Sequence, residues 1–170
     1  MRKYGYYFEN LIKNSADQIG VDISDFQCNE DSIAFEVDGV SVFGFLIPVE
    51  GGAKLRLLYD VVNVEFSPYD SDKLLQAYNK INEYNLLEGG MLQLVLVPSD
   101  NEDKLQLFLK AIDVVAIDDI MYTEELRNYF INLFADILMF VNNLEVFNEE
   151  YLSQFERIAS QQEDNVKSHY

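Results

Sequence analysis

A segment that changes its hydrophobic period midway constrains the fold more than any other feature of this sequence. Residues 74–87, LLQAYNKINEYNLL, have helical spacing, and the pattern breaks at Glu88-Gly89-Gly90. Two apolar stretches follow, MLQLVLV at 91–97 and KLQLFLKAI at 104–112, with a polar loop between them. Short apolar runs bounded by turn residues are typical of strands. The segment therefore predicts a helix followed by a pair of antiparallel strands.

The predicted central helix has a start signal and an expected buried stripe. Asp70 or Ser71 can cap it, because their side-chain oxygens can accept hydrogen bonds from the free N–H groups of the first turn. The Gly89-Gly90 pair ends it. The expected stripe consists of Leu74, Leu75, Tyr78 and Ile81, extended by Asn82.

The N-terminal part of the chain predicts one helix and a three-strand meander. Gly20 ends the helix, and Asp38-Gly39 predicts a hairpin with a two-residue turn, because both turn positions need a positive φ. A third strand, KLRLLYDVV, follows at residues 54–62. The helix stripe comprises Phe8, Leu11, Ile12, Ser15 or Ala16, and Ile19. The hairpin register places Ile33, Phe35, Val37, Val40, Val42 and Gly44 on one face, and Gly44 is expected to mark a bulge or close packing.

The last third of the chain is predicted to be helical. Thr123 is a good N-cap, and acidic residues follow in the first turn, where the helix dipole favours them, so a long helix is expected over residues 123–143. A further helix is predicted over 146–158, and residues 161–170 are expected to form a disordered tail. The long helix has a stripe wide enough to cover a sheet, with Leu126, Tyr129, Phe130, Leu133, Phe134, Ile137, Leu138, Val141 and Leu144, and with Met139 and Phe140 beside it.

Together these elements predict an α+β fold. Its antiparallel sheet consists of a three-strand meander and a two-strand hairpin, with an N-terminal helix, a central helix and long C-terminal helices. A chain of 170 residues is long enough for one domain with a real core. Because no repeat or linker interrupts the pattern, residues 1–160 are predicted to form a single domain.

The net charge indicates which classes of partner are unlikely to bind, and the single cysteine bears on the cellular compartment. Thirty acidic residues against twelve basic ones give a formal charge of −18, which disfavours nucleic acid and anionic membranes as partners. This acidic surface either serves solubility or attracts a basic partner segment. Cys28 is the only cysteine, so an intrachain disulfide is impossible. Polar residues such as Glu9 and Lys13 interrupt any apolar signal segment, and we predict a cytoplasmic protein.

No group of residues in the sequence is typical of an active site. His169 is the only histidine and lies in the predicted tail, so no histidine-based relay or metal site is expected. Cys28 lies among acidic residues, which favour the thiol over the nucleophilic thiolate. The acidic clusters at 70–72, 100–103 and 118–119 lack the spacing of an EF-hand. We therefore predict no enzymatic activity, no cofactor and no metal.

The order of the elements and the segment AYNKINEYN resemble the type III secretion chaperone-like superfamily, including its YbjN-like branch. Asn79 and Asn82 lie on the central helix before a glycine-rich entry into a strand, and a later helix contains an internal acidic residue, Asp136. The resemblance covers residues 6–144. It implies a twisted antiparallel sheet, frequent dimerisation, binding of extended client segments along exposed apolar patches, and a structural role for Asn79 and Asn82 at the helix-to-sheet junction. The extension beyond Leu144 departs from the secretion chaperones.

The predicted hairpin places three large apolar residues opposite the core. Phe43, Phe45 and Ile47 alternate with the inward-facing residues and point to the other face of the sheet. If helices cover one side only, these three residues form an exposed partner-binding site. In the alternative, the N-terminal helix or the C-terminal extension covers them.

These features favour a non-enzymatic protein-binding module, a chaperone or adaptor that holds a segment of a partner protein on an apolar sheet face. Acidic rim residues would orient that segment. A homodimer would use the same face. An immunity or regulatory protein that binds a toxin or enzyme domain is an alternative. A carboxylate- and metal-dependent hydrolase is a further alternative, which needs several acidic residues to converge in one pocket.

Overall fold

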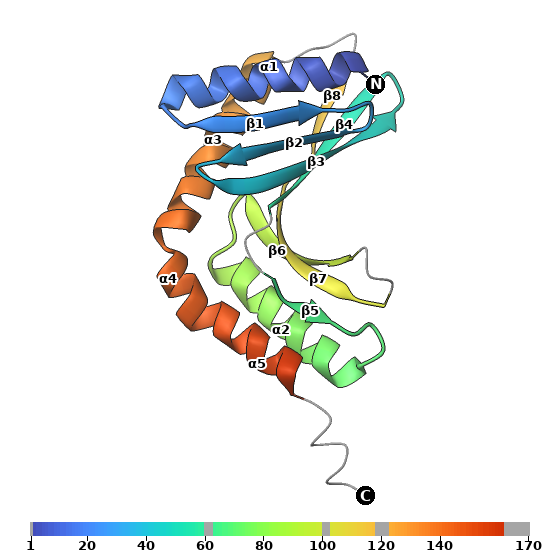
Figure 1. The fold of residues 1–170 in the computed structure, drawn as a ribbon, viewed down its shortest axis with the longest axis vertical. Helices are drawn as coiled ribbons and strands as arrows, with labels where there is room; N and C mark the ends of the chain where they lie inside the picture. Colours follow the sequence, from blue (N-terminus) through green and yellow to red (C-terminus); the bar gives the residue numbers. More distant parts are fainter. Residues whose placement is uncertain (1, 60–62, 100–102, 118–122, 162–170) are drawn as a thin grey trace, which may run out of the picture.

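The computed structural model describes residues 2–59, 63–99, 103–117 and 123–161. Within these ranges, helices pack against a curved antiparallel sheet of eight strands, which confirms the predicted α+β fold (Figure 1). Apart from Gln161, the predicted tail lies outside the described residues. In chain order the elements are α1 (Arg2–Ile19), β1 (Ile23–Cys28), β2 (Ser32–Val37), β3 (Val40–Val49), β4 (Gly52–Tyr59), β5 (Glu65–Phe66), α2 (Ser71–Leu87), β6 (Leu92–Pro98), β7 (Leu105–Ala111), β8 (Val114–Ile117), α3 (Thr123–Asn142), α4 (Leu144–Phe147), the π-helix η1 (Asn148–Leu152) and α5 (Ser153–Ser160).

The meander at the start of the sheet is one strand longer than predicted. Strands β1 to β4 are neighbours in their chain order. β1 escapes prediction because Asp25 adopts a positive φ of 52° and the register with β2 shifts between Ser24 and Gln27. Such an irregularity interrupts the alternation of side chains from which a strand is predicted. β5 and β8, with two and four residues, are too short for a period to be recognised.

The first hairpin has the predicted turn and register. Asp38 and Gly39 both have positive φ, 47° and 83°, as a two-residue turn of this type requires. The pairs Val37 with Val40, Phe35 with Val42, and Ile33 with Gly44 are all present. Gly44 marks close packing without a bulge, because a Cβ there would lie 2.9 Å from a methyl group of Leu57.

β7 and β8 form one extended stretch that pairs with two parts of β4. Leu55 lies opposite Val114, and Leu58 lies opposite Lys110. Three steps along β4, from 55 to 58, therefore match four steps along the partner, from 110 to 114. The additional residue is a β-bulge, which bends a strand and increases its twist. Below the bulge β7 leaves the meander and pairs with β6 and β5 (Figure 1).

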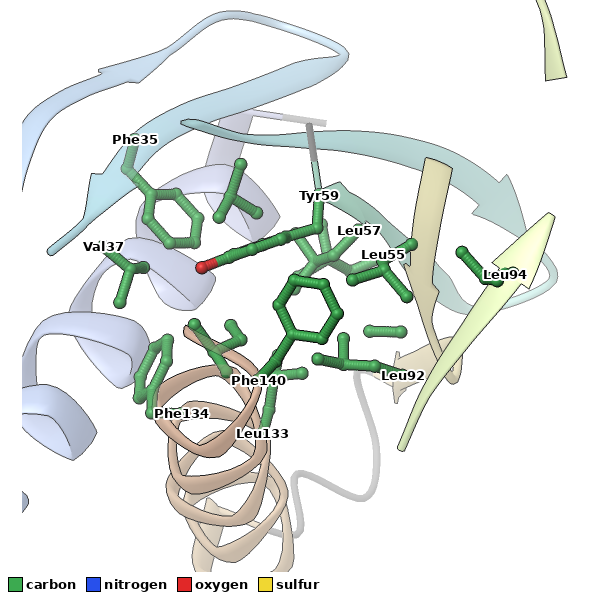
Figure 2. Close-up of a cluster of buried hydrophobic side chains, with 14 of the residues drawn as sticks. Phe35, Val37, Leu55, Leu57, Tyr59, Leu92, Leu94, Leu133, Phe134 and Phe140 are labelled. Carbon is green, nitrogen blue, oxygen red and sulfur yellow. The ribbon is translucent and has the colours of Figure 1, made fainter. Parts of the chain in front are cut away.

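The main core lies between the inner face of the meander and helices α1 and α3. Figure 2 shows Leu133, Phe134 and Phe140 of α3 facing side chains of β2, β4 and β6. The prediction that the α3 stripe packs against the sheet is confirmed for its buried members, whereas Met139 is exposed. The Tyr59 hydroxyl is buried in this core without a hydrogen-bond partner among the described residues. Its burial raises the pKa of Tyr59, so the phenol stays protonated.

Helix α2 has the predicted cap but a different buried face. Asp70 Oδ1 accepts a hydrogen bond from the Lys73 backbone N–H at 3.1 Å, which confirms the N-cap. The predicted stripe is wrong at Leu75 and Tyr78, which are both exposed. The buried residues are Lys73, Ala77, Ile81 and Tyr84. Lysine is tolerated there because its ammonium group donates to the carbonyl of Ala159, at 2.7 Å, in the last turn of α5.

The junction between α2 and β6 depends on Asn85. Asn79 and Asn82 are exposed on α2, so the structural role that the resemblance implies for them is not observed. Instead the Asn85 side chain accepts a hydrogen bond from Leu94 N at 2.8 Å and donates to Leu94 O at 3.1 Å. An amide can replace a neighbouring strand in this way, because it offers one donor and one acceptor. Asn85 thereby satisfies the backbone N–H and C=O groups of Leu94, which lie at the edge of β6 that pairs with no other strand in the described sheet.

The predicted C-terminal helix is present as the continuous run of α4, η1 and α5. Phe147, Tyr151, Phe155 and Ile158 are its buried residues. This run curves along α2 on the same side of the sheet (Figure 1). Within the described ranges no single helix is long and apolar enough to cross a membrane; α3 and Leu144–Ser160 reach that limit only as a pair bent by 68°.

Candidate protein-binding face

The outer face of β3 carries the three residues that the sequence assigns to partner binding. The side chains of Phe43 and Phe45 are 42% and 47% exposed, and Ile47 is half-buried. Their neighbours Val42 and Leu46 point inward and are buried. The alternation of side chains along an extended strand therefore brings Phe43, Phe45 and Ile47 together on one surface.

Neither α1 nor the C-terminal helices cover this surface in the described chain. Phe8, Leu11 and Ile12 of α1 belong to the core on the inner side of the sheet. The C-terminal run packs its buried side chains beside α2. The alternative in which one of these elements shields Phe43 and Phe45 is therefore wrong for the single chain.

Strand pairing extends the surface beyond β3. Phe43 lies opposite Leu58, Phe45 opposite Arg56, and Ile47 opposite Lys54, and residues directly opposite each other share a face. Lys54 in turn lies opposite Val115, and Leu58 opposite Lys110. We use the name outer sheet face for Phe43, Phe45, Ile47, Lys54, Arg56, Leu58, Lys110, Val115 and Ile117.

The sequence pattern does not predict the contribution of β8 to this face. Val115 and Ile117 are 43% and 42% exposed, and their alternation with the buried Ala116 is the local signal for a half-buried strand. In four residues that signal is too short to stand out. The pairing of β8 with β4, which places these residues beside Lys54, is a long-range contact.

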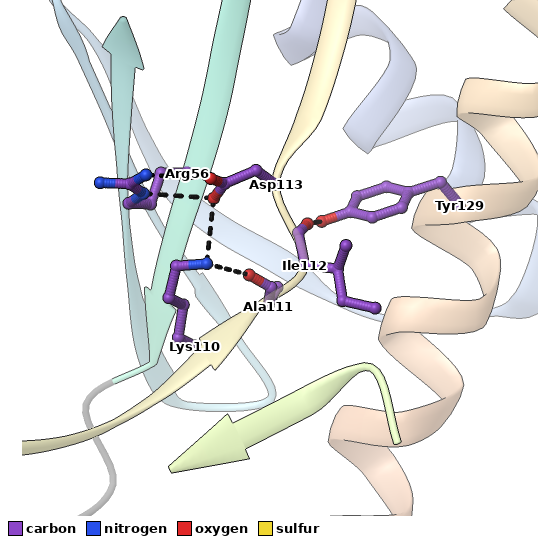
Figure 3. Close-up of polar contacts among 6 residues, drawn as sticks. All are labelled: Arg56, Lys110, Ala111, Ile112, Asp113 and Tyr129. Carbon is purple, nitrogen blue, oxygen red and sulfur yellow. Dashed lines mark hydrogen bonds and ion pairs between the residues drawn. The ribbon is translucent and has the colours of Figure 1, made fainter. Parts of the chain in front are cut away.

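A polar network lies at the β-bulge in the centre of this region (Figure 3). Arg56 donates two hydrogen bonds to Asp113, Nε to Oδ1 at 3.2 Å and Nη2 to Oδ2 at 3.0 Å. Lys110 Nζ lies 3.2 Å from Asp113 Oδ1. The hydrogen bond from Arg56, supported by Lys110, lowers the pKa of Asp113. Bidentate pairing fixes the guanidinium group at the bulge.

On the helix side of the bulge, Tyr129 of α3 binds the backbone between β7 and β8. Its hydroxyl donates a hydrogen bond to the carbonyl of Ile112 (Figure 3). Burial raises the pKa of Tyr129, and the charge of Asp113 adds to this effect. The phenol therefore stays a donor at neutral pH, and the bulge is held from both the helix side and the outer side.

The charge of the outer sheet face differs from that of the whole chain. Lys54, Arg56 and Lys110 are three of the twelve basic residues of a chain with a formal charge of −18. Asp113 compensates part of this charge, and Arg56 remains 40% exposed in its side chain. Phe43, Phe45 and Ile47 thus have basic groups beside them on β4 and β7, and Glu36 of β2 adds one carboxylate to the same face of the sheet.

Other candidate residues from the sequence are not assembled into a site. Cys28 packs against Gly5 of α1, so closely that a Cβ on the glycine would clash with the sulfur. His169 and the 118–119 pair lie outside the described residues, as do positions 100–102. Among the described residues no three His, Cys, Asp or Glu side chains are arranged to hold a metal ion.

Comparisons of the chain with protein-family models, with curated proteins and with solved structures found no match in any of the three. The resemblance to secretion chaperones therefore stays an expectation that rests on the order of the elements and on the segment AYNKINEYN.

Proposed function

We propose that this chain is a non-enzymatic protein-binding module whose outer sheet face holds a segment of a partner protein. The observation that carries the proposal is the exposure of Phe43 and Phe45 in the middle of a sheet whose helices lie on the other side. Contiguous apolar surface of this kind is typical of interaction sites.

The energetics favour contact through these two rings. Complete burial of a phenylalanine side chain is worth roughly 1.5 to 3 kcal/mol, so covering the exposed half of each ring contributes about 1 kcal/mol. Val115 and Ile117 enlarge the apolar area. Large rings held by a rigid strand lose little conformational entropy on binding, which is the usual property of anchor residues in interfaces.

The charges on the face select the chemistry of the partner. Lys54 and the exposed part of Arg56 lie directly beside Ile47 and Phe45. A segment with apolar side chains and a neighbouring carboxylate complements this arrangement better than a basic segment does. We therefore propose that the outer sheet face binds an apolar segment that also carries acidic residues.

Replacing Phe45 with Asp tests the proposal. Partners are captured with the unaltered protein from cells of the native host, produced in pure form, and their affinities for both proteins are measured. We expect Phe45→Asp to weaken binding about 10- to 100-fold, because an unpaired carboxylate is then buried in the interface. Thermal unfolding of the free variant should change little, since the position is exposed.

Leu86→Asp is the matched control, because Leu86 is 84% exposed on α2, away from this face. It introduces the same charge and should leave binding unchanged. Equal binding by Phe45→Asp and the unaltered protein would refute the proposed face. Sedimentation decides a second point: a dimer that dissociates on Phe45→Asp would identify a second copy as the occupant and overturn the partner-segment proposal.

We include in the proposal a chaperone or adaptor role and a cytoplasmic location. The identity of the partner tests the role. An immunity or regulatory protein would use the same kind of surface against a folded toxin or enzyme domain. The partner distinguishes these roles: a segment that binds as an isolated peptide supports the chaperone or adaptor, whereas binding that requires the folded domain supports the alternative.

A further inference from the structure

A cavity of about 220 Å³ lies on the helix side of the sheet, where the end of α2 meets α3, α4 and η1. It is separate from the outer sheet face, because Leu92 of the inner face is one of its walls. Its aromatic walls and its carboxylates define what we name the aromatic–acidic pocket: Tyr84, Phe147, Tyr151, Glu88, Asp136 and Glu150.

The aromatic wall is built by a π-helical turn. The rings of Tyr84 and Tyr151 are 5.0 Å apart and nearly perpendicular, and Tyr84 and Phe147 are 5.6 Å apart in the same arrangement. Residues four apart lie slightly more than one turn apart in an α-helix and slightly less than one turn apart in the wider π-helix. Because η1 at residues 148–152 lies between two α-helical segments, the two deviations compensate each other. Phe147, Tyr151 and Phe155 therefore stay on one side of the run.

Two tyrosine hydroxyls in this pocket lack partners. Tyr84 and Tyr151 are buried as residues, and no described residue forms a hydrogen bond with either hydroxyl. In contrast to the Tyr59 hydroxyl, neither oxygen is fully buried. Both oxygens therefore reach the open space of the pocket and can accept a hydrogen bond from a ligand.

The pocket is also electronegative. Glu88, Asp136 and Glu150 line it, and no described basic residue does. Burial, and then neighbouring negative groups headed by Glu88, raise the pKa of Tyr84 to about 12. Burial and the same glutamate also raise the pKa of Tyr151. At neutral pH the phenols are uncharged and the carboxylates carry the charge of the site.

One carboxylate is held in place by the backbone. Asp136 Oδ2 accepts a hydrogen bond from Met91 N at 3.1 Å. A Cβ at Gly90 would lie 3.1 Å from the same oxygen, so glycine leaves room for this contact. The α3 helix thereby contributes an acidic group of fixed position to the lining of the cavity.

We propose that the aromatic–acidic pocket binds an organic cation, an alkylammonium or guanidinium group. Aromatic faces attract cations, and carboxylates and tyrosine oxygens accept their N–H hydrogen bonds. One aromatic wall already contacts such a group from outside the pocket, because Lys80 Nζ lies 5.3 Å from the centre of the Tyr151 ring. The inference stands on this pocket alone and is independent of the proposed function.

Other ligand classes fit less well. Anions are repelled by the three carboxylates, and a bare metal ion has no set of three suitable side chains among the described residues. A wholly apolar ligand would leave the carboxylates and the two hydroxyls without partners at the cost of desolvating them. An organic cation satisfies the aromatic and the polar walls together.

Titration of the full chain with agmatine, which has both an ammonium and a guanidinium group, tests the proposal. Amide shifts of Gly90 and Leu92 in nuclear magnetic resonance spectra report on binding. We expect binding to weaken about two- to fivefold in Glu88→Gln and in Glu150→Gln, since each removes one exposed carboxylate charge from the pocket lining. Tetramethylammonium should bind as well, because it needs only the ring faces.

The control variant is Glu149→Gln, which removes an exposed charge beside Glu150 that does not line the pocket. It should leave the affinity unchanged. An equal loss in Glu149→Gln would show attraction to an acidic surface and no site. Absence of saturable shifts with agmatine and with tetramethylammonium would overturn the inference, as would tighter binding of succinate than of agmatine.

The natural cation has two possible sources, which a second arm of the experiment separates. Pentapeptides with one central arginine or lysine, blocked at both ends, are titrated beside agmatine. A peptide that binds about tenfold tighter than agmatine identifies a basic side chain of a protein. Tighter binding of agmatine identifies a free amine. Either ranking, together with the loss in Glu150→Gln, supports the same recognition chemistry.

Discussion

The two faces of β3 differ in a way that their residue types alone do not explain. Val42 and Leu46 on the inner face are buried, whereas the larger Phe43 and Phe45 on the outer face are nearly half exposed. Hydrophobicity would favour burying the phenylalanines first. The difference shows that the placement of α1 and α3, and not side-chain size, decides which face of this strand becomes core.

The tightness of packing separates the same two faces. On the inner face Gly44 leaves room for Leu55 and Leu57, whose methyl groups would lie 3.1 and 2.9 Å from an added Cβ. On the outer face Phe43 lies over the buried Leu58, but both phenylalanine rings are themselves exposed, and Arg56 beside Phe45 is partly exposed. Substitutions on the two faces should therefore have different consequences, for folding on one side and for binding on the other.

The largest expected effect is on the helix that covers the inner face. Phe134 is fully buried, so Phe134→Ala removes its apolar contacts and leaves a cavity. We expect the free energy of unfolding to fall by about 3 to 5 kcal/mol, as measured by urea denaturation. Met139→Ala is the control on the same helix, because Met139 is 63% exposed. A Phe134→Ala protein as stable as its Met139→Ala counterpart would show that the inner face is not the core.

An intermediate effect is expected when the two faces of β3 receive the same side chain. Gly44→Val forces a branched side chain into the space of Leu55 and Leu57, and we expect a loss of about 2 to 3 kcal/mol. Ser41→Val places the same side chain on the outer side of the strand, where the change should stay within about 0.5 kcal/mol. Calorimetric unfolding of both variants measures the contrast. Equal stabilities of the two variants would contradict the distinction between a tightly packed inner face and an open outer face.

The smallest expected effect concerns the ion network beside the outer face. Asp113→Asn removes both pairs with Arg56 and Lys110, and we expect a loss of about 1 kcal/mol at pH 7 after allowance for solvent screening. The folded protein lowers the pKa of Asp113, so the carboxylate stabilises the fold above the pKa of the unfolded chain, about 4. This contribution disappears as the pH falls through the lower folded pKa.

Urea denaturation at pH 7 and at pH 3 measures this contribution. The difference in stability between the unaltered protein and Asp113→Asn should shrink at the lower pH. Glu156→Gln is the control, since Glu156 is an exposed acid on α5 without a described ion pair. A difference that is independent of pH would show that the effect of Asp113→Asn is steric and not electrostatic.

Local patterns predicted the elements that are long or have specific turn chemistry. The Asp38-Gly39 turn defines the hairpin register because both residues must adopt positive φ. The same register placed Phe43, Phe45 and Ile47 on one face. The short strands β5 and β8 and the irregular β1 could not be recognised, because they have too few residues or too broken an alternation for a period to be detected.

The candidate sites were predicted less completely than the elements. Val115 and Ile117 join the outer sheet face only through the pairing of β8 with β4. The aromatic–acidic pocket combines Tyr84, Asp136 and Tyr151, which come from three separate helical segments. No local pattern connects such residues, and none distinguishes Asn85, which binds the edge of β6, from the exposed Asn79 and Asn82.

The sequence by itself determined the α+β class, the hairpin register and the extent of α3, because each follows from dihedral preferences and from hydrophobic spacing over a few turns or residue pairs. Only the tertiary structure decided which faces are covered. Lys73 is buried because its ammonium group reaches the carbonyl of Ala159, and the Arg56 guanidinium is held at the bulge because Asp113 binds it. These contacts join residues far apart in the chain, so their geometry depends on how the helices and the curved sheet pack together, and with it the exposure of Phe43 and Phe45.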